Sequence, residues 1–370
     1  MTTTLRFLRE YVRPRADAVE IHELRYDREG EPLTARLYRP AGRRGSLPTW
    51  VMLHGLTWHG AAHPSLHRFA RAVSAAGPEE LAPDVPEWRR LEVAPAVTAP
   101  SLSGAIDAAC EAGITTPGRV AALGFSFGAT QLLAATAANP ALARRLYAIA
   151  AWGGYCDLRR LFRFGFSGEY EHDGVRYRAQ PDPYGAWIMG ANFLTQIPGY
   201  ASHDDVAGAL ARLAHESGRR GIFAGDAAYD PLKRELRQML PPDRRPIFDA
   251  FAPVTGQAVP DPELAAWLTE ALADAAAGAE PLLDPASLLP RLDVRTLLAH
   301  GREDRLVPFT ETLQLGRIIP APCRDSHTPT PLFPPPGLNS DIPLPLRLTR
   351  ESVRFVQLLY RLLGLAPAPR

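Results

Sequence analysis

The chain has 370 residues, of which 46% are hydrophobic and 22% charged, and its formal net charge is +1. This balance is ordinary for a globular enzyme, and no long basic or acidic block indicates a nucleic-acid surface. The length suits one core with a substantial insertion, or two domains. Lys233 is the only lysine, which argues against Schiff-base or pyridoxal chemistry.

The cysteines and the N-terminus bear on the compartment. Cys110, Cys156 and Cys323 are scattered and odd in number, so they outline neither a disulfide framework nor a metal site. Residues 1–16 carry charges among their apolar residues and do not resemble a signal peptide, and no run of 18 apolar residues is present to span a membrane. We therefore expect a cytoplasmic protein.

The first part of the chain alternates between strand and helix patterns. Two strand-like segments joined by turn residues predict an antiparallel hairpin. Apolar strand-like runs and helical runs then alternate, which indicates a mostly parallel sheet with helices on both faces. The predicted elements are a short docking helix with Leu5, Leu8 and Val12 on one face, strands 18–26, 32–38, 50–53, 81–86, 119–123 and 146–152, and helices 64–76, 101–112 and about 127–139.

The pattern changes after the strand at 146–152. An aromatic-rich section is followed by helical segments, and we interpret this part as an inserted helical cap. The strand pattern then returns, and an amphipathic helix closes the chain. The predicted organisation is a first core part at 1–155, a cap at 156–290 with helices near 205–217, 230–240 and 262–275, and a second core part at 291–370 with a strand at 294–299 and a helix at 349–364.

The stretch Gly124-Phe125-Ser126-Phe127-Gly128 has the form Gly-x-Ser-x-Gly between a predicted strand and a predicted helix. A serine on such a sharp turn has unusual backbone angles, so the flanking positions must be very small, which the two glycines satisfy. The turn lifts the hydroxyl clear of the sheet. Ser126 is therefore the candidate nucleophile. The alternative is a glycine-containing turn between strand and helix in which the serine has no catalytic role.

A serine hydroxyl needs a base to take its proton, and the base needs an acid to orient it. In the order serine, acid, histidine, we expect each group at the end of a strand, where loops converge. Asp304 follows a predicted buried strand and is the favoured acid, with Glu303 and Asp157 as alternatives. His327 is the only histidine after Asp304, which makes it the sole candidate base in this order.

With these residues the chain resembles the α/β-hydrolase superfamily, in particular its dienelactone-hydrolase-like and serine-esterase branches. The resemblance covers about residues 18–155 and 291–370. It implies an eight-stranded, mostly parallel sheet with every catalytic group at the carboxyl edge. The matching pieces are His54-Gly55, Gly124-Phe125-Ser126-Phe127-Gly128, His300-Gly301 with Asp304 and Val307-Pro308, and His327.

The same resemblance implies an oxyanion hole made by the backbone N–H of Phe127 and that of Leu56 or Thr57. The expected function is a serine hydrolase acting through an acyl-enzyme on a small acyl substrate, with a carboxylic-ester hydrolase and a cap-covered apolar site as the first choice. A peptidase, thioesterase, C–C hydrolase or acyltransferase would use the same triad. A non-catalytic binding protein on this fold is the alternative of another class. No nucleotide, haem or redox motif indicates a cofactor.

Four histidines fall within fourteen residues, at His54, His59, His63 and His67. The last three recur every four residues, a spacing that could bind zinc on a helix. A glycine and a proline interrupt the segment, and no acidic residue or cysteine lies close by to complete a site. We therefore expect no metal, assign His54 to the oxyanion loop, and keep a metal-dependent hydrolase as the remaining alternative.

Overall fold

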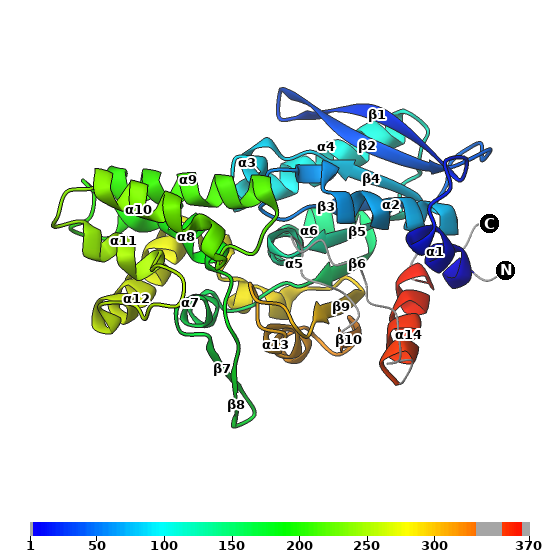
Figure 1. The fold of residues 1–370 in the computed structure, drawn as a ribbon. Helices are drawn as coiled ribbons and strands as arrows, with labels where there is room; N and C mark the ends of the chain where they lie inside the picture. The colour runs from blue at the N-terminus through cyan, green and yellow to red at the C-terminus, as the bar shows by residue number, and fades with distance from the viewer. Residues whose placement is uncertain (1–2, 331–349, 365–370) are drawn as a thin grey trace.

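The computed structural model describes residues 3–330 and 350–364, and its centre is a single eight-stranded sheet (Figure 1). The strand order is β1-β2-β4-β3-β5-β6-β9-β10. β2 pairs antiparallel with β1 and with β4, and all other neighbours are parallel. The strands are β1 (Val19–Arg28), β2 (Glu31–Pro40), β3 (Thr49–Leu53), β4 (Glu79–Pro83), β5 (Val120–Phe125), β6 (Leu146–Trp152), β9 (Thr296–Gly301) and β10 (Arg324–Thr330). The predicted eight-stranded, mostly parallel sheet is confirmed.

Hydrophobic clusters on the two faces of this sheet form the core. Successive residues of a strand point to opposite faces, so in β5 Val120 and Ala122 join one cluster while Ala121 and Leu123 join the other. Helices cover both faces, as expected for parallel strands. One face carries α1 (Thr3–Val12), α2 (Pro64–Ala76) and α14 (Arg350–Gly364), and the other carries α4 (Thr98–Glu111), α5 (Phe127–Ala138) and α13 (Thr310–Ile318). The short helices α3 (Pro86–Arg89) and α6 (Pro140–Ala143) lie in connections.

The chain between β6 and β9, residues 153–295, adds no strand to the large sheet, and we call it the inserted segment. It lies to the left of the sheet in Figure 1, with a hairpin projecting below. The sequence predicts helices alone here, so the hairpin is a correction to the all-helical interpretation. The segment contains α7 (Leu158–Ser167), β7 (Glu169–His172), β8 (Val175–Arg178), α8 (Pro183–Phe193), α9 (Asp204–Arg220), α10 (Asp230–Met239), α11 (Arg245–Phe251) and α12 (Pro262–Ala279).

The last strand also differs from the prediction. β10 begins at Arg324, after the prolines at 320 and 322, and it includes His327, which we expected at the end of a strand. It pairs in parallel with β9 from Arg324 to Thr330. Of the proline-rich stretch 329–346, residues 329 and 330 belong to β10 and the others lie outside the described residues, whereas the predicted final helix is present as α14.

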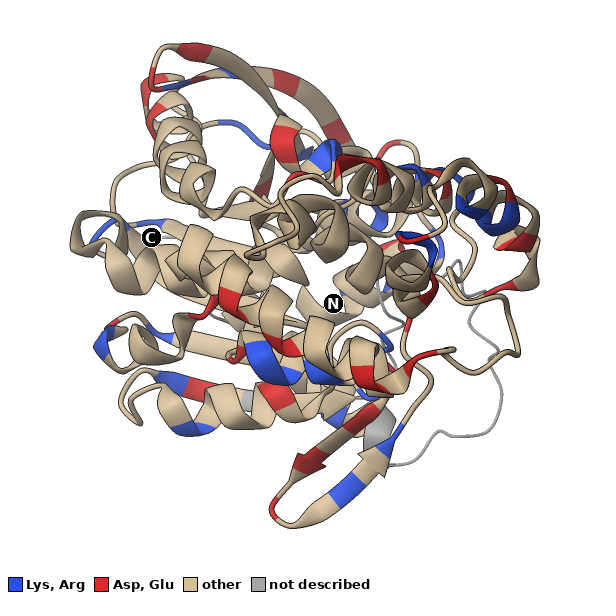
Figure 2. Cartoon of the chain, turned by 90° about the vertical axis from the view of Figure 1, so that its left-hand side faces the viewer, with Lys and Arg blue, Asp and Glu red and all other residues tan. Residues whose placement is uncertain are grey.

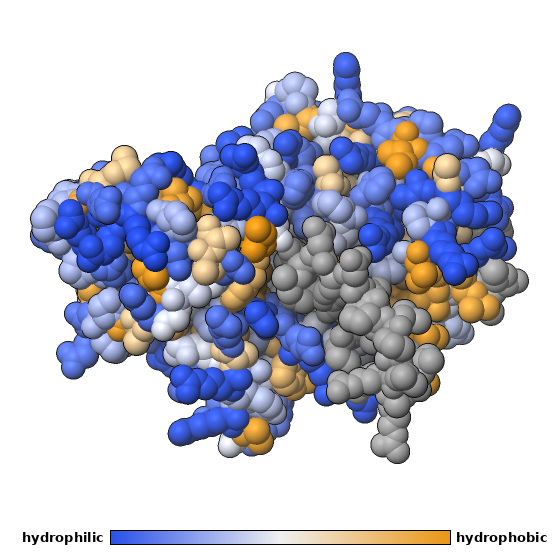
Figure 3. Space-filling model, viewed as in Figure 1, coloured by the Kyte–Doolittle hydropathy of each residue, from blue (hydrophilic) through white to orange (hydrophobic). Residues whose placement is uncertain are grey.

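Charged and apolar residues are mixed on the two sides of the molecule drawn in Figures 2 and 3. Acidic and basic residues are interspersed over the side shown in Figure 2, whereas in the hairpin the acidic residues lie on β7 and the basic ones on β8. Hydrophilic residues surround scattered apolar ones on the face in Figure 3. None of the described helices combines the length and the apolar character needed to cross a bilayer.

Candidate active site

Ser126 lies on the turn between β5 and α5, with φ 53° and ψ −122°. An L-residue holds such angles only where its surroundings impose them. A Cβ on Gly124 would lie 2.4 Å from the carbonyl oxygen of Gly128, and a Cβ on Gly128 would lie 2.3 Å from that of His54. The N–H of Ser126 donates to the carbonyl of Trp152 at 2.7 Å. Both glycines are therefore required, and the turn is tied to β6.

The loop after β3 runs beside this serine. A Cβ on Gly55 would lie 3.2 Å from Ser126 Cβ and 3.6 Å from Ser126 Oγ. The buried His54 anchors the loop, because its Nδ1 bonds the carbonyl of Gly55 at 2.7 Å and its Nε2 accepts from the N–H of Val85 at 3.2 Å. Burial lowers the pKa of His54, so the imidazole is a neutral structural bridge.

The three expected oxyanion donors border the serine. The N–H groups of Leu56 and Thr57, directly after Gly55, donate to no acceptor among the described residues. Phe127 is the first residue of α5, so its N–H has no partner within the helix. The helix N-terminus also favours negative charge at this point. Unpaired N–H groups on two sides of a serine are what a developing oxyanion needs.

Asp304 approaches the serine from the other side. A Cβ on Gly153 would lie 3.6 Å from Asp304 Oδ2 and 3.8 Å from the backbone nitrogen of Ser126, so this glycine separates the two groups. Asp304 Oδ1 accepts from the N–H groups of Leu306 and Val307, at 2.8 and 3.0 Å. Burial raises the pKa of Asp304 to about 6, although these two bonds oppose the shift.

The two alternative acids lie elsewhere. Asp157 caps α7, accepting from the N–H of Arg160 at 2.8 Å and pairing with its guanidinium at 3.0 Å. Glu303 is exposed. None of the three candidate acids lines the cavities that reach Ser126, but Asp304 alone is found beside Gly153, next to the serine. Of the three candidate acids, Asp304 is the one that the structure brings to the serine.

His300 is close to Asp304 but has a structural role. Its Nδ1 bonds Thr312 Oγ1 at 2.7 Å and its Nε2 bonds the carbonyl of Val307 at 2.9 Å, so both ring nitrogens are engaged. Burial lowers the pKa of His300 to about 4. A neutral imidazole fixed in this way holds the Asp304 loop and is not available to accept a proton from Ser126.

The backbone of His327 does not lie beside Ser126. It pairs with Leu298 of β9, which pairs with Ala151 of β6, which in turn pairs with Gly124 of β5. Three strand spacings separate His327 from β5, or about 14 Å at 4.8 Å per strand. The side chain of His327 lies outside the described part of the chain.

Two cavities meet at Ser126 and share part of their walls. The first, which we call the apolar lobe, has a volume of about 90 Å³, and the second, the polar lobe, about 310 Å³. Both are lined by Leu56, Ser126, Asp182, Tyr184 and Leu306; the apolar lobe adds Phe127, Tyr155, Leu161, Phe162, Gly165, Phe166, Gly185, Ala186, Ile188, Met189 and Val307, whereas the polar lobe adds Thr57, His59, His63, Arg219, Arg220, Phe223 and Arg305 among others.

The inserted segment supplies two site residues that the sequence analysis does not identify. Asp182 caps α8 by accepting from the N–H of Tyr184 at 3.0 Å, and burial raises its pKa to about 6. The hydroxyl of Tyr184 donates to the carbonyl of Leu56 at 3.3 Å. An aspartate before Pro183 is a recognisable helix start, but no local pattern indicates that this helix end faces Ser126.

The histidine cluster is divided between separate contacts. His67 Nδ1 bonds the hydroxyl of Tyr38 at 3.0 Å, and His63 Nδ1 accepts from the N–H of Ser65 at 3.3 Å. The rings of His59 and His63 lie 5.7 Å apart, and burial lowers the pKa of His63 to about 4. Within residues 3–330 and 350–364, no group of three or more potential ligands converges to hold a metal ion.

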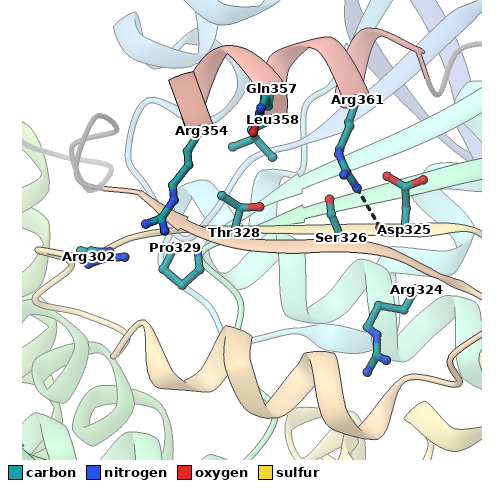
Figure 4. A pocket seen from close by; sticks show the side chains of 10 residues that line it. All are labelled: Arg302, Arg324, Asp325, Ser326, Thr328, Pro329, Arg354, Gln357, Leu358 and Arg361. Atoms are coloured by element: carbon teal, nitrogen blue, oxygen red, sulfur yellow. Dashed lines mark hydrogen bonds between the residues drawn. The ribbon is translucent and has the colours of Figure 1, made fainter. Parts of the chain in front are cut away.

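A further cavity, of about 540 Å³, lies between β10 and α14, away from the serine (Figure 4). Ser326 and Thr328, the neighbours of His327, line it from β10. Arg361 crosses it from α14 and donates to the carbonyl of Asp325 at 3.2 Å. Because it contains neither Ser126 nor Asp304, we do not assign the chemistry to this cavity.

The strand order, the serine turn after β5 and the insertion after β6 define the α/β-hydrolase fold, and this chain has it. No family model and no curated protein matches the sequence. Similar solved structures include a 2-hydroxy-6-oxo-6-phenylhexa-2,4-dienoate hydrolase (BphD) from Rhodococcus sp. strain RHA1, with 19% identity over 81% of this chain and 88% of that chain and a TM-score of 0.42.

Two esterases are among the other similar structures. Est1E from Butyrivibrio proteoclasticus has 11% identity over 80% of this chain and 84% of that chain, with a TM-score of 0.41. Brefeldin A esterase, a bacterial homologue of human hormone sensitive lipase, has 15% identity over 86% of this chain and 73% of that chain, with a TM-score of 0.42.

Proposed function

We propose that the protein is a serine hydrolase that acts through an acyl-enzyme, and that its substrates are carboxylic esters. The observation that supports this most is the position of Ser126. Its turn is fixed by two obligatory glycines, it borders N–H groups without acceptors, and it opens into an apolar lobe and a polar lobe. Residues 156–290 would then be the cap over this site, because Asp182 and Tyr184 belong to its walls.

In the proposed reaction, Ser126 Oγ bonds to the ester carbonyl carbon while its proton passes to an imidazole base. Asp304 holds that imidazole, and the N–H groups of Phe127 and of Leu56 or Thr57 stabilise the oxyanion. Collapse of the tetrahedral intermediate breaks the bond to the alcohol oxygen, which receives the proton. A water molecule then attacks the carbonyl carbon of the acyl-enzyme with the help of the same base, and collapse of the second tetrahedral intermediate releases the acid and restores Ser126.

His327 stays the predicted base, since it is the only histidine after Asp304 in the chain. This role requires the stretch around His327 to leave its pairing with β9, because three strand spacings exceed the reach of an imidazole. His59 and His63 are the two histidines whose described side chains line the cavities at Ser126. They are the competing candidates for the base.

Kinetics on a chain-length series of nitrophenyl esters, beside aminoacyl amides, test the reaction class. We expect turnover of esters with short acyl groups, and a loss of kcat of at least about 10⁴-fold in Ser126→Ala. Turnover of amides alone would replace the esterase proposal by a peptidase. Unchanged turnover in Ser126→Ala would refute the serine mechanism.

Three single variants, His327→Gln, His59→Gln and His63→Gln, identify the base. The proposal expects a loss of about 10⁴-fold in kcat for His327→Gln and changes below tenfold for the other two. A large loss in His59→Gln or His63→Gln, with little change in His327→Gln, would instead identify a histidine after β3 as the base. Full activity in all three variants would exclude these three histidines as the base.

A non-catalytic binding protein on the same fold is the second candidate. It is favoured by one observation: among the described residues, no imidazole makes a hydrogen bond to Ser126 Oγ or to Asp304. Absence of turnover on every ester, amide and thioester tested, with ligand binding retained, would support this candidate. The cytoplasmic location and the small acyl substrate remain predictions in either case.

A further inference from the structure

The wall of the polar lobe contains more arginines than carboxylates. Arg219, Arg220 and Arg305 are part of its wall. Asp182 is the carboxylate in the same wall, and Glu216 lies close to two of the arginines. Three arginines and one carboxylate therefore belong to the wall itself, in a cavity that leads to the proposed nucleophile, and Glu216 and Asp304 lie close behind it.

Two of the arginines have structural roles. Arg219 and Arg220 lie in the last turn of α9, where positive charge offsets the helix dipole. Both pair with Glu216, at 3.3 and 2.6 Å. Arg220 also lies over the ring of Tyr229, at 5.4 Å from its centre. These contacts account for both side chains without a ligand.

Arg305 is held differently. Its guanidinium carbon lies 4.9 Å from the ring centre of Phe223, another residue of the wall. No carboxylate of the described residues lies within 4 Å of its side-chain nitrogens, although its charge partly offsets the rise that burial causes in the pKa of Asp182, in the same wall. Its backbone carbonyl accepts from the N–H of Asp182 at 2.8 Å, which fixes the loop between Asp304 and Leu306. Stacking orients the planar guanidinium and leaves its N–H donors available.

We propose that the polar lobe binds a carboxylate on the alcohol part of the ester, with Arg305 as its main ligand. This inference rests on the proposed function and names the substrate class of that site. A guanidinium matches a carboxylate through two parallel hydrogen bonds. His63 adds a neutral donor, because its Nδ1 accepts from Ser65 and the ring proton is therefore on Nε2.

Each lobe suits one part of the ester, the apolar lobe the acyl group and the polar lobe the alcohol. The apolar lobe, walled by Phe162, Ile188 and Met189, suits a short acyl chain. The polar lobe is the larger one, and Arg305 is exposed at its wall. A charged alcohol released there can leave to solvent while the acyl group stays on Ser126.

Two matched compounds test the inference without depending on catalysis. Binding of 4-hydroxybenzoate and of the isosteric but neutral 4-hydroxybenzamide is measured by calorimetry on the wild type, on Arg305→Gln and on Arg219→Gln. Arg219→Gln is the matched control, since it removes the same charge from the same wall. We expect the carboxylate to bind at least tenfold more tightly than the amide, and Arg305→Gln to abolish that preference while Arg219→Gln changes it less than threefold.

The corresponding acetate esters, 4-acetoxybenzoate and 4-acetoxybenzamide, extend the test to turnover. The preference in kcat/KM should fall about tenfold in Arg305→Gln, and the intrinsic reactivity of the two esters cancels in that ratio. It should also fall with added salt, because ions screen an exposed charge. Thermal unfolding of each variant, expected to match the wild type, controls for folding.

Several outcomes would overturn the inference. These are equal binding of carboxylate and amide, no binding of the carboxylate at 10 mM, an equal effect of Arg219→Gln, or tighter binding of a trimethylammonium analogue, which would assign the lobe to Asp182. Carboxylate binding that depends on Arg305, without turnover of either ester, would support the subsite and contradict the proposed function.

Discussion

The two walls of the cavity at Ser126 are built in different ways. On the sheet side, a methyl group at Gly124 or Gly128 would overlap backbone atoms at 2.4 or 2.3 Å. On the side of the inserted segment, Gly165 of α7 lines the apolar lobe and has no atom within 4 Å of the place its Cβ would take. The sheet wall therefore fixes the reacting groups, whereas the inserted wall leaves room that decides which acyl groups fit.

The largest effect should come from the sheet wall, in Asp304→Asn. The amide oxygen can still accept from the N–H groups of Leu306 and Val307, so the loop keeps its bonds. The charge that orients an imidazolium is lost, and we expect kcat to fall about 10⁴-fold. Stopped assays on a nitrophenyl ester measure this. A loss below tenfold would move the acid to Asp157 or Glu303.

The same variant has an opposite effect on stability. Burial raises the pKa of Asp304 to about 6, so the folded protein holds this proton more tightly than the unfolded chain. The contribution of Asp304 to the stability of the wild type therefore falls as pH rises from about 4 to about 6, by on the order of 1–3 kcal/mol. Asp304→Asn does not titrate, and its stability relative to the wild type should increase over this range. Urea unfolding at pH 4.5 and 7.5 tests this, and a difference independent of pH would contradict it.

Gly128→Ala should be the next largest change, acting on stability. Its methyl group would press on the His54 carbonyl, and we expect a loss of about 3 kcal/mol in the free energy of unfolding. The control is Gly208→Ala in the exposed part of α9, where the new methyl meets nothing within 4 Å. That change should be neutral or stabilise by up to about 1 kcal/mol. Similar losses in both variants would mean that the turn at Ser126 does not specifically require glycine at position 128.

The smallest effect should be the change of selectivity in Gly165→Leu on the inserted wall. The side chain enters the apolar lobe, so kcat/KM for octanoyl esters should fall at least tenfold while that for acetyl esters stays within twofold. Tenfold corresponds to about two methylene groups of lost burial. A parallel fall for both chain lengths would place the acyl group elsewhere.

Much of the sheet side can be predicted from the sequence, because its signals are local. Leu146–Trp152 and Pro64–Ala76 are found with the predicted bounds. The two glycines around Ser126 predict, from the sequence alone, that these two positions have no room for a side chain. The docking helix shows the limit of periodicity: Leu8 of the predicted face packs against the core, but Leu5 and Val12 are 52% and 61% exposed, and the buried residue is Phe7, against Phe69.

The inserted side depends on contacts between distant residues, and its prediction is less complete. The β7–β8 hairpin has a local signal in Asp173-Gly174, both at positive φ, which the helical interpretation misses. Asp182 and Arg305 have no such signal, because their position at Ser126 follows from how α8 and the loop after β9 meet. His327 lies within β10 because that strand starts after the prolines at 320 and 322.

The mass of the protein after reaction with a fluorophosphonate tests the central claim most directly. A serine activated as a nucleophile should take up one phosphonyl group, mapped by peptide sequencing to the Phe125-Ser126-Phe127 stretch, and Ser126→Ala should take up none. Equal labelling of the wild type and Ser126→Ala, or no labelling of a folded wild type, would contradict the account.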